Sequence, residues 1–81
     1  MKIEIYTKDG CTLCTQAKNL VASKGLTYVE HYVTADNRTQ MITTLSSRMG
    51  EIPRSLPQIF IDDVAIGGFD QLRAVLQPRS V

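Results

Sequence analysis

The 81-residue sequence contains no tryptophan, one histidine, three prolines and only two cysteines. Nine basic and eight acidic residues give a net charge of +1, with no long run of either sign. This balance gives no electrostatic reason to expect nucleic acid or a membrane surface as a partner. No apolar stretch approaches the ~20 residues of a transmembrane helix. The N-terminus has an acidic residue inside its apolar stretch and does not resemble a signal peptide.

The overall composition is that of a globular protein. Hydrophobic residues make up 43% and charged residues 21% of the chain, which argues against a disordered, collagenous or coiled-coil protein. A chain of this length is near the lower limit at which a hydrophobic core holds without staples. We therefore expect a single domain over residues 1–81, in the cytoplasm, where thiols are kept reduced.

Hydrophobic periodicity and turn residues predict seven secondary-structure elements. In chain order they are a strand over 2–6, a helix over 11–24, a strand over 27–33, a helix from Thr34 or Asp36 to Met49, strands over 58–61 and 64–66, and a helix over 69–76 that stops at Pro78.

The order β-α-β-α-β-β-α limits the possible folds. A strand, a crossover helix and a second strand in so few residues indicate a parallel βαβ unit, and the last two strands read as a hairpin. Together they predict an α/β protein with a four-stranded mixed sheet and helices on both faces. This is the thioredoxin-like arrangement.

The two cysteines, Cys11 and Cys14, lie between the first predicted strand and the first predicted helix. A disulfide between them would close a very short loop, which makes it a weak structural cross-link. A C-x-x-C pair also serves zinc, but structural zinc needs four protein ligands, and the sequence offers only His31 and scattered carboxylates besides. Two ordinary buried cysteines remain an alternative. The position at a strand-to-helix turn favours a reactive dithiol.

The two cysteines are expected to play different roles. Unpaired backbone N–H groups and the positive end of the helix dipole stabilise a thiolate in the first turn of a helix, where Cys11 is predicted. Lys8 adds a nearby positive charge. Cys14 is on the same helical face one turn deeper. Cys11 should therefore be the exposed attacking thiol, and Cys14 the shielded thiol that resolves a mixed disulfide.

Three segments of the chain resemble glutaredoxins, including the small ones of bacteria and tailed phages. They are IYTKDGCTLC at 5–14, SLPQIFIDD at 55–63 and IGGFDQL at 66–72. The resemblance covers nearly the whole chain. It implies a dithiol oxidoreductase that reduces protein disulfides and glutathione mixed disulfides, with glutathione as the reducing co-substrate and no tightly bound cofactor.

The same resemblance implies roles for individual residues. Cys11 matches the family nucleophile and Cys14 the resolving cysteine. Six further positions match the glutathione site: Lys8 near a glutathione carboxylate, Leu56 whose backbone pairs with the glutathione cysteine, Pro57 as a cis proline, and Gly68, Phe69 and Asp70 around the γ-glutamyl end.

Plainer interpretations exist for several of these positions. The Leu56–Pro57 bond could be an ordinary trans bond in a loop, Gly68 part of a strand break, and Asp70 only the N-cap of the last helix. Phe69 is expected in the core with one edge toward the groove. Arg54 is expected to be a solvated loop residue within reach of a carboxylate. His31 is expected to lie in a strand without a catalytic partner. The tyrosines Tyr6, Tyr28 and Tyr32 are expected to pack within strands.

The chain also departs from the commonest glutaredoxin pattern. Thr12 and Leu13 stand between the cysteines, where proline and an aromatic residue are usual. Without that proline the start of the helix loses a preset φ angle. Gln71 stands where many members have an acidic or small polar residue. These differences bear on substrate preference and reduction potential.

Three functions compete. The first is a dithiol oxidoreductase recharged by glutathione, acting as a monomer on disulfide-containing proteins, with ribonucleotide reductase as one candidate. The second is a redoxin recharged by thioredoxin reductase that donates electrons to ribonucleotide reductase. The third is an iron–sulfur carrier in which Cys11 from each of two chains and two glutathione thiolates hold a cluster. No all-protein metal site is expected.

Overall fold

Four strands form one mixed sheet in the order β2-β1-β3-β4, in a computed structural model that describes residues 1–77. β1 is parallel to β2 and antiparallel to β3, and β3 is antiparallel to β4. The predicted mixed sheet and the order of elements are confirmed. The elements are β1 (Ile3–Lys8), α1 (Thr12–Ser23), β2 (Val29–Val33), α2 (Arg38–Met49), β3 (Gln58–Ile61), β4 (Val64–Gly67) and α3 (Phe69–Leu76).

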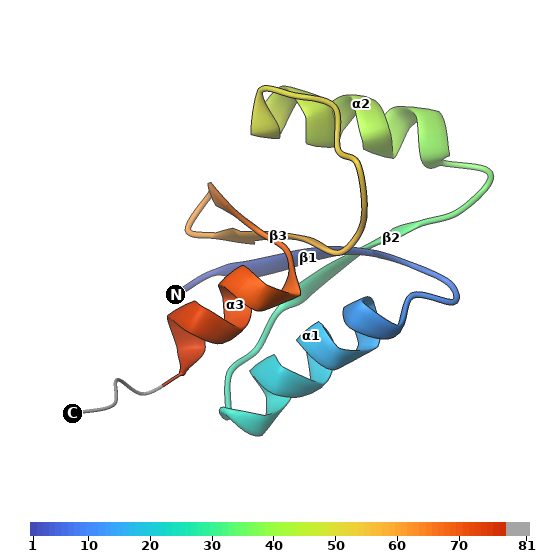
Figure 1. Cartoon of the computed structure of the whole chain (residues 1–81). Helices are drawn as coiled ribbons and strands as arrows, with labels where there is room; N and C mark the ends of the chain where they lie inside the picture. Colours follow the sequence, from blue (N-terminus) through green and yellow to red (C-terminus); the bar gives the residue numbers. More distant parts are fainter. Residues whose placement is uncertain (78–81) are drawn as a thin grey trace.

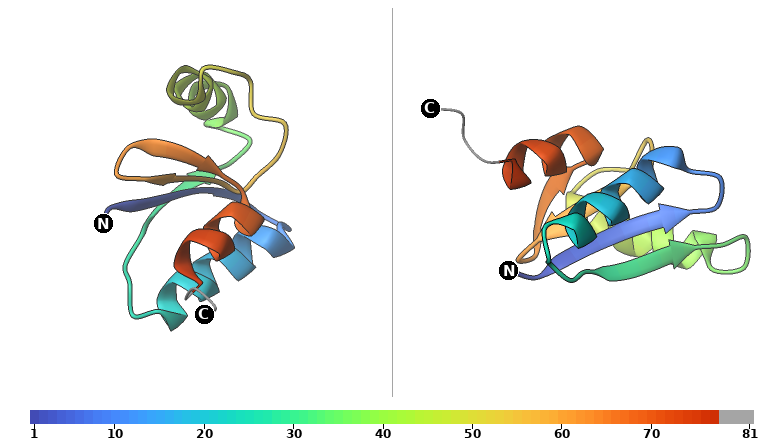
Figure 2. Two further views of the ribbon diagram at one scale, coloured as in Figure 1. Left: turned by 60° about the vertical axis from the view of Figure 1, so that its left-hand side comes forward. Right: turned by 90° about the horizontal axis from the view of Figure 1, so that it is seen from below.

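The helices cover the two faces of the sheet unequally. Helices α1 and α3 lie side by side on one face, and α2 lies alone on the other (Figures 1 and 2). β1 and β3 are the inner strands, so their side chains are covered from both sides. Five consecutive residues of β1, 3–7, are buried. This arrangement gives the molecule two small cores separated by the sheet.

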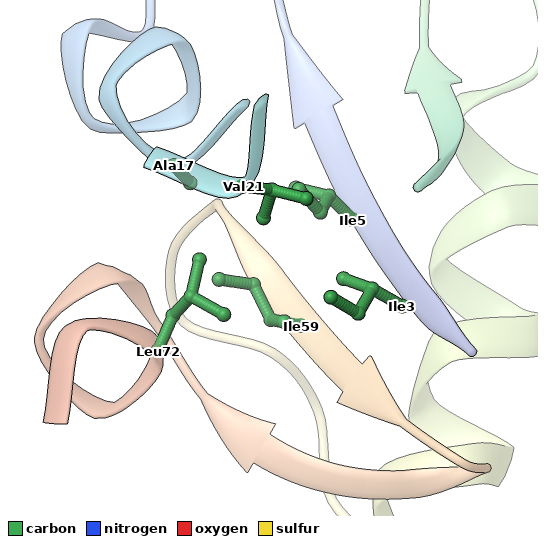
Figure 3. Packing of buried hydrophobic residues seen from close by; sticks show 6 residues of the cluster. All are labelled: Ile3, Ile5, Ala17, Val21, Ile59 and Leu72. Atoms are coloured by element: carbon green, nitrogen blue, oxygen red, sulfur yellow. The ribbon is translucent and has the colours of Figure 1, made fainter. Parts of the chain in front are cut away.

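The larger core holds α1 and α3 against the sheet. It consists of aliphatic side chains with at most 2% of their surface exposed, which meet between the two helices and the sheet in Figure 3. Burying one of its isoleucine, leucine or valine side chains contributes roughly 1.5–3 kcal/mol, so this packing gives α1 a firm position. Its members are Ile3, Ile5, Ala17, Val21, Ile59 and Leu72.

The smaller core lies between the sheet and α2. Its buried members are Tyr6, Leu45 and Phe60, with Met49 and Leu56 packed against them. Leu45 is the one residue of α2 that is fully buried. The apolar contact between α2 and the sheet is therefore narrow.

A network of charged side chains supplements this contact. The Arg48 guanidinium donates two hydrogen bonds to the Glu4 carboxylate, 2.9 Å from Nη1 to Oε1 and 2.8 Å from Nη2 to Oε2. Glu4 is only 5% exposed. The same guanidinium lies 3.9 Å from the centre of the Phe60 ring, and His31 Nε2 lies 2.9 Å from Glu4 Oε1. A fork of two charge-assisted bonds is among the strongest polar contacts in proteins.

His31 lies in a strand, as predicted, and its contact with Glu4 is one that the sequence interpretation did not identify. Its ring also stacks at 4.5 Å on that of Tyr6. The register of β1 and β2 places His31 opposite Tyr6, and Glu4, the acidic residue that interrupts the first apolar segment, lies within reach of the same ring. The hydrogen bonds from Arg48, with a smaller contribution from His31, lower the pKa of Glu4 from 4.5 to about 2.

The start of α2 also differs from the prediction. The helix begins at Arg38, with Asn37 at its N-cap, rather than at Thr34 or Asp36. The Thr34 N–H donates to Asn37 Oδ1 at 2.8 Å, and the Asn37 N–H donates to Thr34 Oγ1 at 3.3 Å. These reciprocal bonds close a turn ahead of the helix and delay its start.

The other boundaries shift by about two residues. The first strand runs to Lys8, and the second begins at Val29. The hairpin turn falls at Asp62 and Asp63 as predicted, both at positive φ, which is the geometry of tight hairpin turns. Pro78, the predicted stop of the last helix, lies outside the described residues.

We predict that Glu4 contributes a pH-dependent part of the stability. Because its pKa in the folded chain is lowered to about 2, this contribution is fully present above pH 4.5 and is lost as the pH falls through 2. Its size is about 3 kcal/mol. The difference in unfolding free energy between wild type and Glu4→Gln should therefore shrink from pH 6 to pH 2, measured by urea denaturation. Glu51→Gln, at an exposed loop position, is the control. A difference that stays constant with pH would contradict the prediction.

Candidate active site

The two cysteines occupy the start of α1. Cys11 is the N-cap residue, with extended backbone angles (φ −99°, ψ 101°), and its Sγ accepts a hydrogen bond from the Cys14 N–H at 3.1 Å. The prediction placed Cys11 in the first turn, one residue too far into the helix. The N-cap is the better position for an anion, because side chains there accept from the free N–H groups.

The cysteines form a disulfide in this structure. Their Cα atoms are 5.2 Å apart, within the range that a disulfide needs. Cys11 is half-buried, whereas Cys14 has only 1% of its surface exposed. The more accessible sulfur is therefore that of Cys11, as the sequence predicts for an attacking thiol and a shielded partner.

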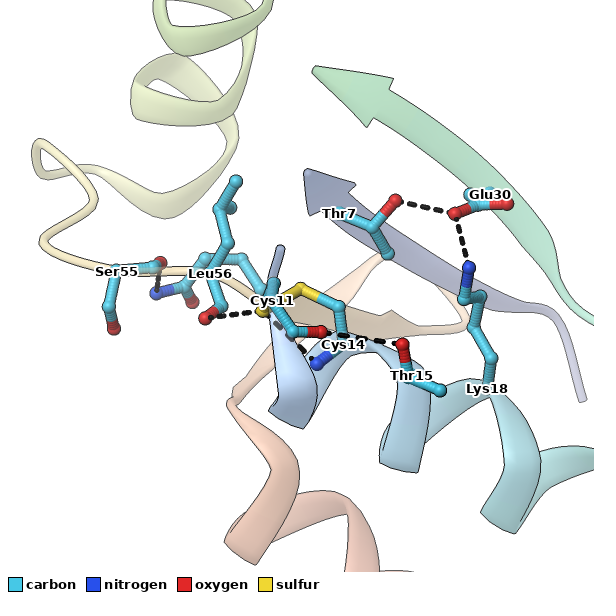
Figure 4. The surroundings of a disulfide bond; sticks show 9 residues. Thr7, Cys11, Cys14, Thr15, Lys18, Glu30, Ser55 and Leu56 are labelled. Atoms are coloured by element: carbon cyan, nitrogen blue, oxygen red, sulfur yellow. Dashed lines mark hydrogen bonds and ion pairs between the residues drawn. A yellow bond between two sulfur atoms is a disulfide. The ribbon is translucent and has the colours of Figure 1, made fainter. Parts of the chain in front are cut away.

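The loop before β3 also lies close to the Cys11 sulfur. The Leu56 carbonyl oxygen lies 3.5 Å from Cys11 Sγ (Figure 4). The bond from Leu56 to Pro57 is cis, as the family resemblance implies. Within residues 1–77 the Leu56 N–H donates to no protein acceptor. A short stretch of free backbone therefore faces the dithiol.

The segment at the start of α3 adjoins this loop. A side-chain Cβ at Gly68 would lie 3.5 Å from the carbonyl oxygen of Pro57, so the two backbones run close together. Phe69 packs against the larger core, as expected. Gly68, not Asp70, is the N-cap of α3. Asp70 lies inside the first turn, where its largely exposed carboxylate is 3.7 Å from Arg73.

A groove of about 430 Å³ opens between α2, the 53–56 loop and the end of β1. We call it the α2 groove. Lys8, Arg38 and Arg54 bring positive charge to it against the single acidic residue Asp9, and Ile42 and Leu56 supply apolar surface. Among the side chains described, neither Lys8 nor Arg38 forms an ion pair. The groove therefore suits a small ligand with carboxylate groups.

A second hollow of about 290 Å³ lies on the other side of Cys11, over the first turns of α1. Thr12, Thr15 and Lys18 line it from the helix, and Tyr32 lines it from β2. Lys8 borders both hollows. Cys11 lines this second hollow but not the α2 groove.

Side-chain contacts stabilise the wall of this second hollow. Tyr32 is 39% exposed and donates a hydrogen bond to Asp9 Oδ1, a contact that raises the pKa of the tyrosine. Tyr32 therefore lines the second hollow, whereas the sequence predicts a strand-packing residue. Behind it, the Thr7 hydroxyl and Lys18 donate to Glu30 Oε2 at 2.6 and 2.9 Å, and together they lower the pKa of Glu30.

The sequence interpretation did not identify Arg38, Tyr32 or Lys18 as residues near the site. The sequence does hold a signal that could have found Arg38 and Tyr32. The parallel strands β1 and β2 end together, with Lys8 opposite Val33. Loops that follow neighbouring parallel strands meet at one edge of the sheet. No comparable signal points to Lys18, whose position follows from its pairing with Glu30.

In residues 1–77, no helix combines the length and apolarity needed to cross a bilayer. Nor do three or more histidine, cysteine, aspartate or glutamate side chains gather there in a way that could hold a metal ion.

Comparisons with known proteins agree on one family. The family model described as glutaredoxin matches residues 3–66. Glutaredoxin 3 of Escherichia coli is 43% identical over 75 residues, which cover 90% of this chain and 83% of that protein. The crystal structure of glutaredoxin 1 from Francisella tularensis, complexed with cacodylate, has a TM-score of 0.76 and 33% identity over 90% of this chain and 88% of that one. A buckwheat glutaredoxin–glutathione complex has a TM-score of 0.70 and 25% identity over 85% of this chain and 62% of that one.

These neighbours establish the fold that the order of elements predicts. The four-stranded mixed sheet with helices on both faces is the thioredoxin-like fold.

We predict that alkylation will separate the two reduced cysteines. At pH 7, iodoacetamide should modify Cys11 at least ten times faster than Cys14, because Cys14 is buried and the Cys14 N–H stabilises a thiolate on Cys11. The midpoint of the Cys11 rate against pH should lie below the value of about 8.5 for a free cysteine. In denaturant both cysteines should react alike. Equal rates in the folded protein would contradict the assignment of roles, and peptide mass spectrometry distinguishes the two sites.

Proposed function

The chain belongs to the glutaredoxin family, and from that membership we propose that glutathione recharges its dithiol. Family membership and the Cys11–Cys14 pair make the protein a thiol–disulfide oxidoreductase. The source of its electrons and the identity of its substrates are the proposal. The observation that carries the proposal is the free Leu56 backbone, whose carbonyl oxygen lies 3.5 Å from the Cys11 sulfur.

The reduction of a protein disulfide proceeds in two exchanges. The Cys11 thiolate attacks one sulfur of the substrate, which forms a mixed disulfide and releases the other sulfur as a thiolate. The Cys14 sulfur, deprotonated as it reacts, then attacks Cys11. This step forms the Cys11–Cys14 disulfide and releases the second substrate thiol. The substrate gains the two electrons that the dithiol loses; one of its two protons comes from Cys14, and water supplies the other because Cys11 reacts as a thiolate.

Two glutathione molecules reverse the oxidation. The first glutathione thiolate attacks the Cys11 sulfur, which forms a glutathione mixed disulfide and frees the Cys14 thiol. The second attacks the glutathione sulfur, releases oxidised glutathione and leaves Cys11 as a thiolate. The attack on a glutathione mixed disulfide by Cys11 alone follows the same chemistry, so Cys14 is needed only where a protein is left bound to Cys11 as a mixed disulfide.

The backbone of the Leu56 loop suits the cysteine residue of glutathione. The unpaired N–H and the carbonyl of Leu56 offer one donor and one acceptor, as an edge strand does to an added peptide. We place the glutathione cysteine there, next to Cys11, with Pro57 fixing the direction of the loop. The solved buckwheat relative is a complex with glutathione, which supports this choice of ligand.

Charged groups at either end suit the two carboxylates of glutathione. Lys8, at the border of the α2 groove, is the proposed partner of one carboxylate. Gly68, Phe69 and Asp70 are the proposed neighbours of the γ-glutamyl end, where the N–H groups of the first turn of α3 favour a carboxylate and the exposed Asp70 favours the ammonium group.

The wider setting follows from the chemistry. A dithiol that must return to the reduced state suits the cytoplasm, where thiols are kept reduced. We propose a monomer of one domain over residues 1–81, acting on disulfide-containing proteins, with ribonucleotide reductase as a candidate.

Coupled assays on the wild type and two cysteine variants test the proposal. We predict turnover with glutathione and glutathione reductase, and little with thioredoxin reductase. Cys11→Ser should lose all thiol transfer, since it lacks the attacking sulfur. Cys14→Ser should keep reduction of an S-glutathionylated peptide, because a second glutathione resolves that intermediate, but should lose reduction of an intramolecular protein disulfide.

Other results of these assays, or of a reconstitution experiment, would contradict the proposal. Turnover with thioredoxin reductase and none with glutathione would establish the redoxin alternative. Loss of peptide deglutathionylation in Cys14→Ser, with retention in Cys11→Ser, would reverse the two roles. A coloured dimer after anaerobic reconstitution with iron, sulfide and glutathione would support the iron–sulfur alternative.

A further inference from the structure

Helix α2 contributes to the α2 groove from its N-terminal half and is fastened to the sheet at its C-terminal end. Arg38 and Ile42 line the groove, while Arg48 makes the paired bonds to Glu4. Figure 1 shows α2 standing apart from the other two helices, alone on its face of the sheet. Whatever holds the far end of α2 therefore affects the shape of the groove.

The apolar attachment of α2 is small. Leu45 is its only fully buried side chain, and the buried core beneath it has just two further members, Tyr6 and Phe60. Arg48 adds contacts to both rings, with its guanidinium 3.9 Å from the centre of Phe60 and an Nη1–H donated to the Tyr6 hydroxyl at 3.1 Å. A guanidinium that stacks on rings and forks onto a carboxylate has one well-defined position.

The same core connects Arg48 with the dithiol. Phe60 lies under the guanidinium, Tyr6 meets Phe60 edge to face at 5.7 Å, and Leu56 packs against this cluster. The backbone carbonyl of Leu56 is the group that lies 3.5 Å from Cys11 Sγ. A continuous series of packed side chains thus runs from the charged pair to the loop that faces the reactive sulfur.

We propose that Arg48 and Glu4 are positioning residues for the glutathione site, although neither touches Cys11 or lines the α2 groove. Their ion pair holds α2 and the Leu56 loop in the arrangement that receives the glutathione moiety. The proposal rests on the proposed function, because it assumes that glutathione binds along Leu56. Loss of the pair should reduce the population of the binding-competent arrangement and so weaken substrate binding, while the reactive sulfur itself is unchanged.

The test compares kinetic constants for an S-glutathionylated peptide. Arg48→Met keeps much of the length of the side chain but removes the charge. It also leaves Glu4 buried without its partner, which can unfold a protein. The double variant Glu4→Gln/Arg48→Met removes both charges together. In either variant that folds, the KM for the peptide should rise by a factor of about 3 to 30, with kcat changed by less than about twofold.

Three controls separate positioning from general damage. Lys24→Met, at an exposed site after α1, should leave KM at the wild-type value. Arg48→Lys keeps a cation but not the fork, and should give an intermediate KM. The rate of Cys11 alkylation by iodoacetamide, which does not need the groove, should stay within about twofold of wild type. A purely structural role would lower the amount of active enzyme and hence Vmax, with KM unchanged.

The outcomes that overturn the inference differ from those that overturn the function. A folded charge-free variant with wild-type KM would refute the positioning role. If neither Arg48→Met nor the double variant folds, Arg48→Lys decides, and a wild-type KM there would refute it equally. A wild-type protein that shows no turnover with glutathione would instead refute the proposed function.

Discussion

The chemistry of this chain depends on a helix that begins at a cysteine. The Cys11 sulfur takes the N-cap position of α1 and accepts the Cys14 N–H at 3.1 Å, so the helix stabilises negative charge on the sulfur that we propose as the attacking one. This position is useful only if the helix cannot tilt or slide. The larger core provides that restraint, because Ala17 and Val21 of α1 are fully buried against the sheet and α3. The same helical periodicity that buries these residues also buries Cys14.

The two faces of the sheet contribute differently to the site. One face fixes α1 through a core of aliphatic side chains, while the other carries α2 on a narrow apolar contact and a buried ion pair. The reactive sulfur therefore lies on the firmly packed side. The α2 groove beside it depends on the more lightly attached helix. Catalytic chemistry and ligand recognition thus rest on separate parts of the packing, and substitutions can alter one without the other.

Much of the fold could be predicted from the sequence, because the elements have clear periodicity and clear breaks. The place of the dithiol at a helix start, with Cys11 more exposed than Cys14, was also predicted from local context. The cis bond before Pro57 came from the family resemblance alone. Sequence periodicity carries no information on the isomer of a proline bond.

Two of the misses depend on partners that are distant in the chain, and the third depends on a local turn. Glu4 looked only like an interruption of an apolar strand, because its partner Arg48 lies 44 residues away. The late start of α2 arose from a turn in which Thr34 and Asn37 bond to each other before the helix begins. Tyr32 looked like strand packing because its partner, Asp9, follows a different strand. The contacts of Glu4 and Tyr32 join polar groups whose pairing becomes visible only once the separate elements are packed together.

An NMR titration of the reduced protein tests the central claim most directly. The backbone amide of Cys14 and the Cβ carbon of Cys11 should be followed together between pH 4 and 10. If the amide binds the Cys11 sulfur, both signals should shift with one shared midpoint, below the value of about 8.5 for a free thiol. A Cys14 amide that does not respond while Cys11 ionises would contradict the account.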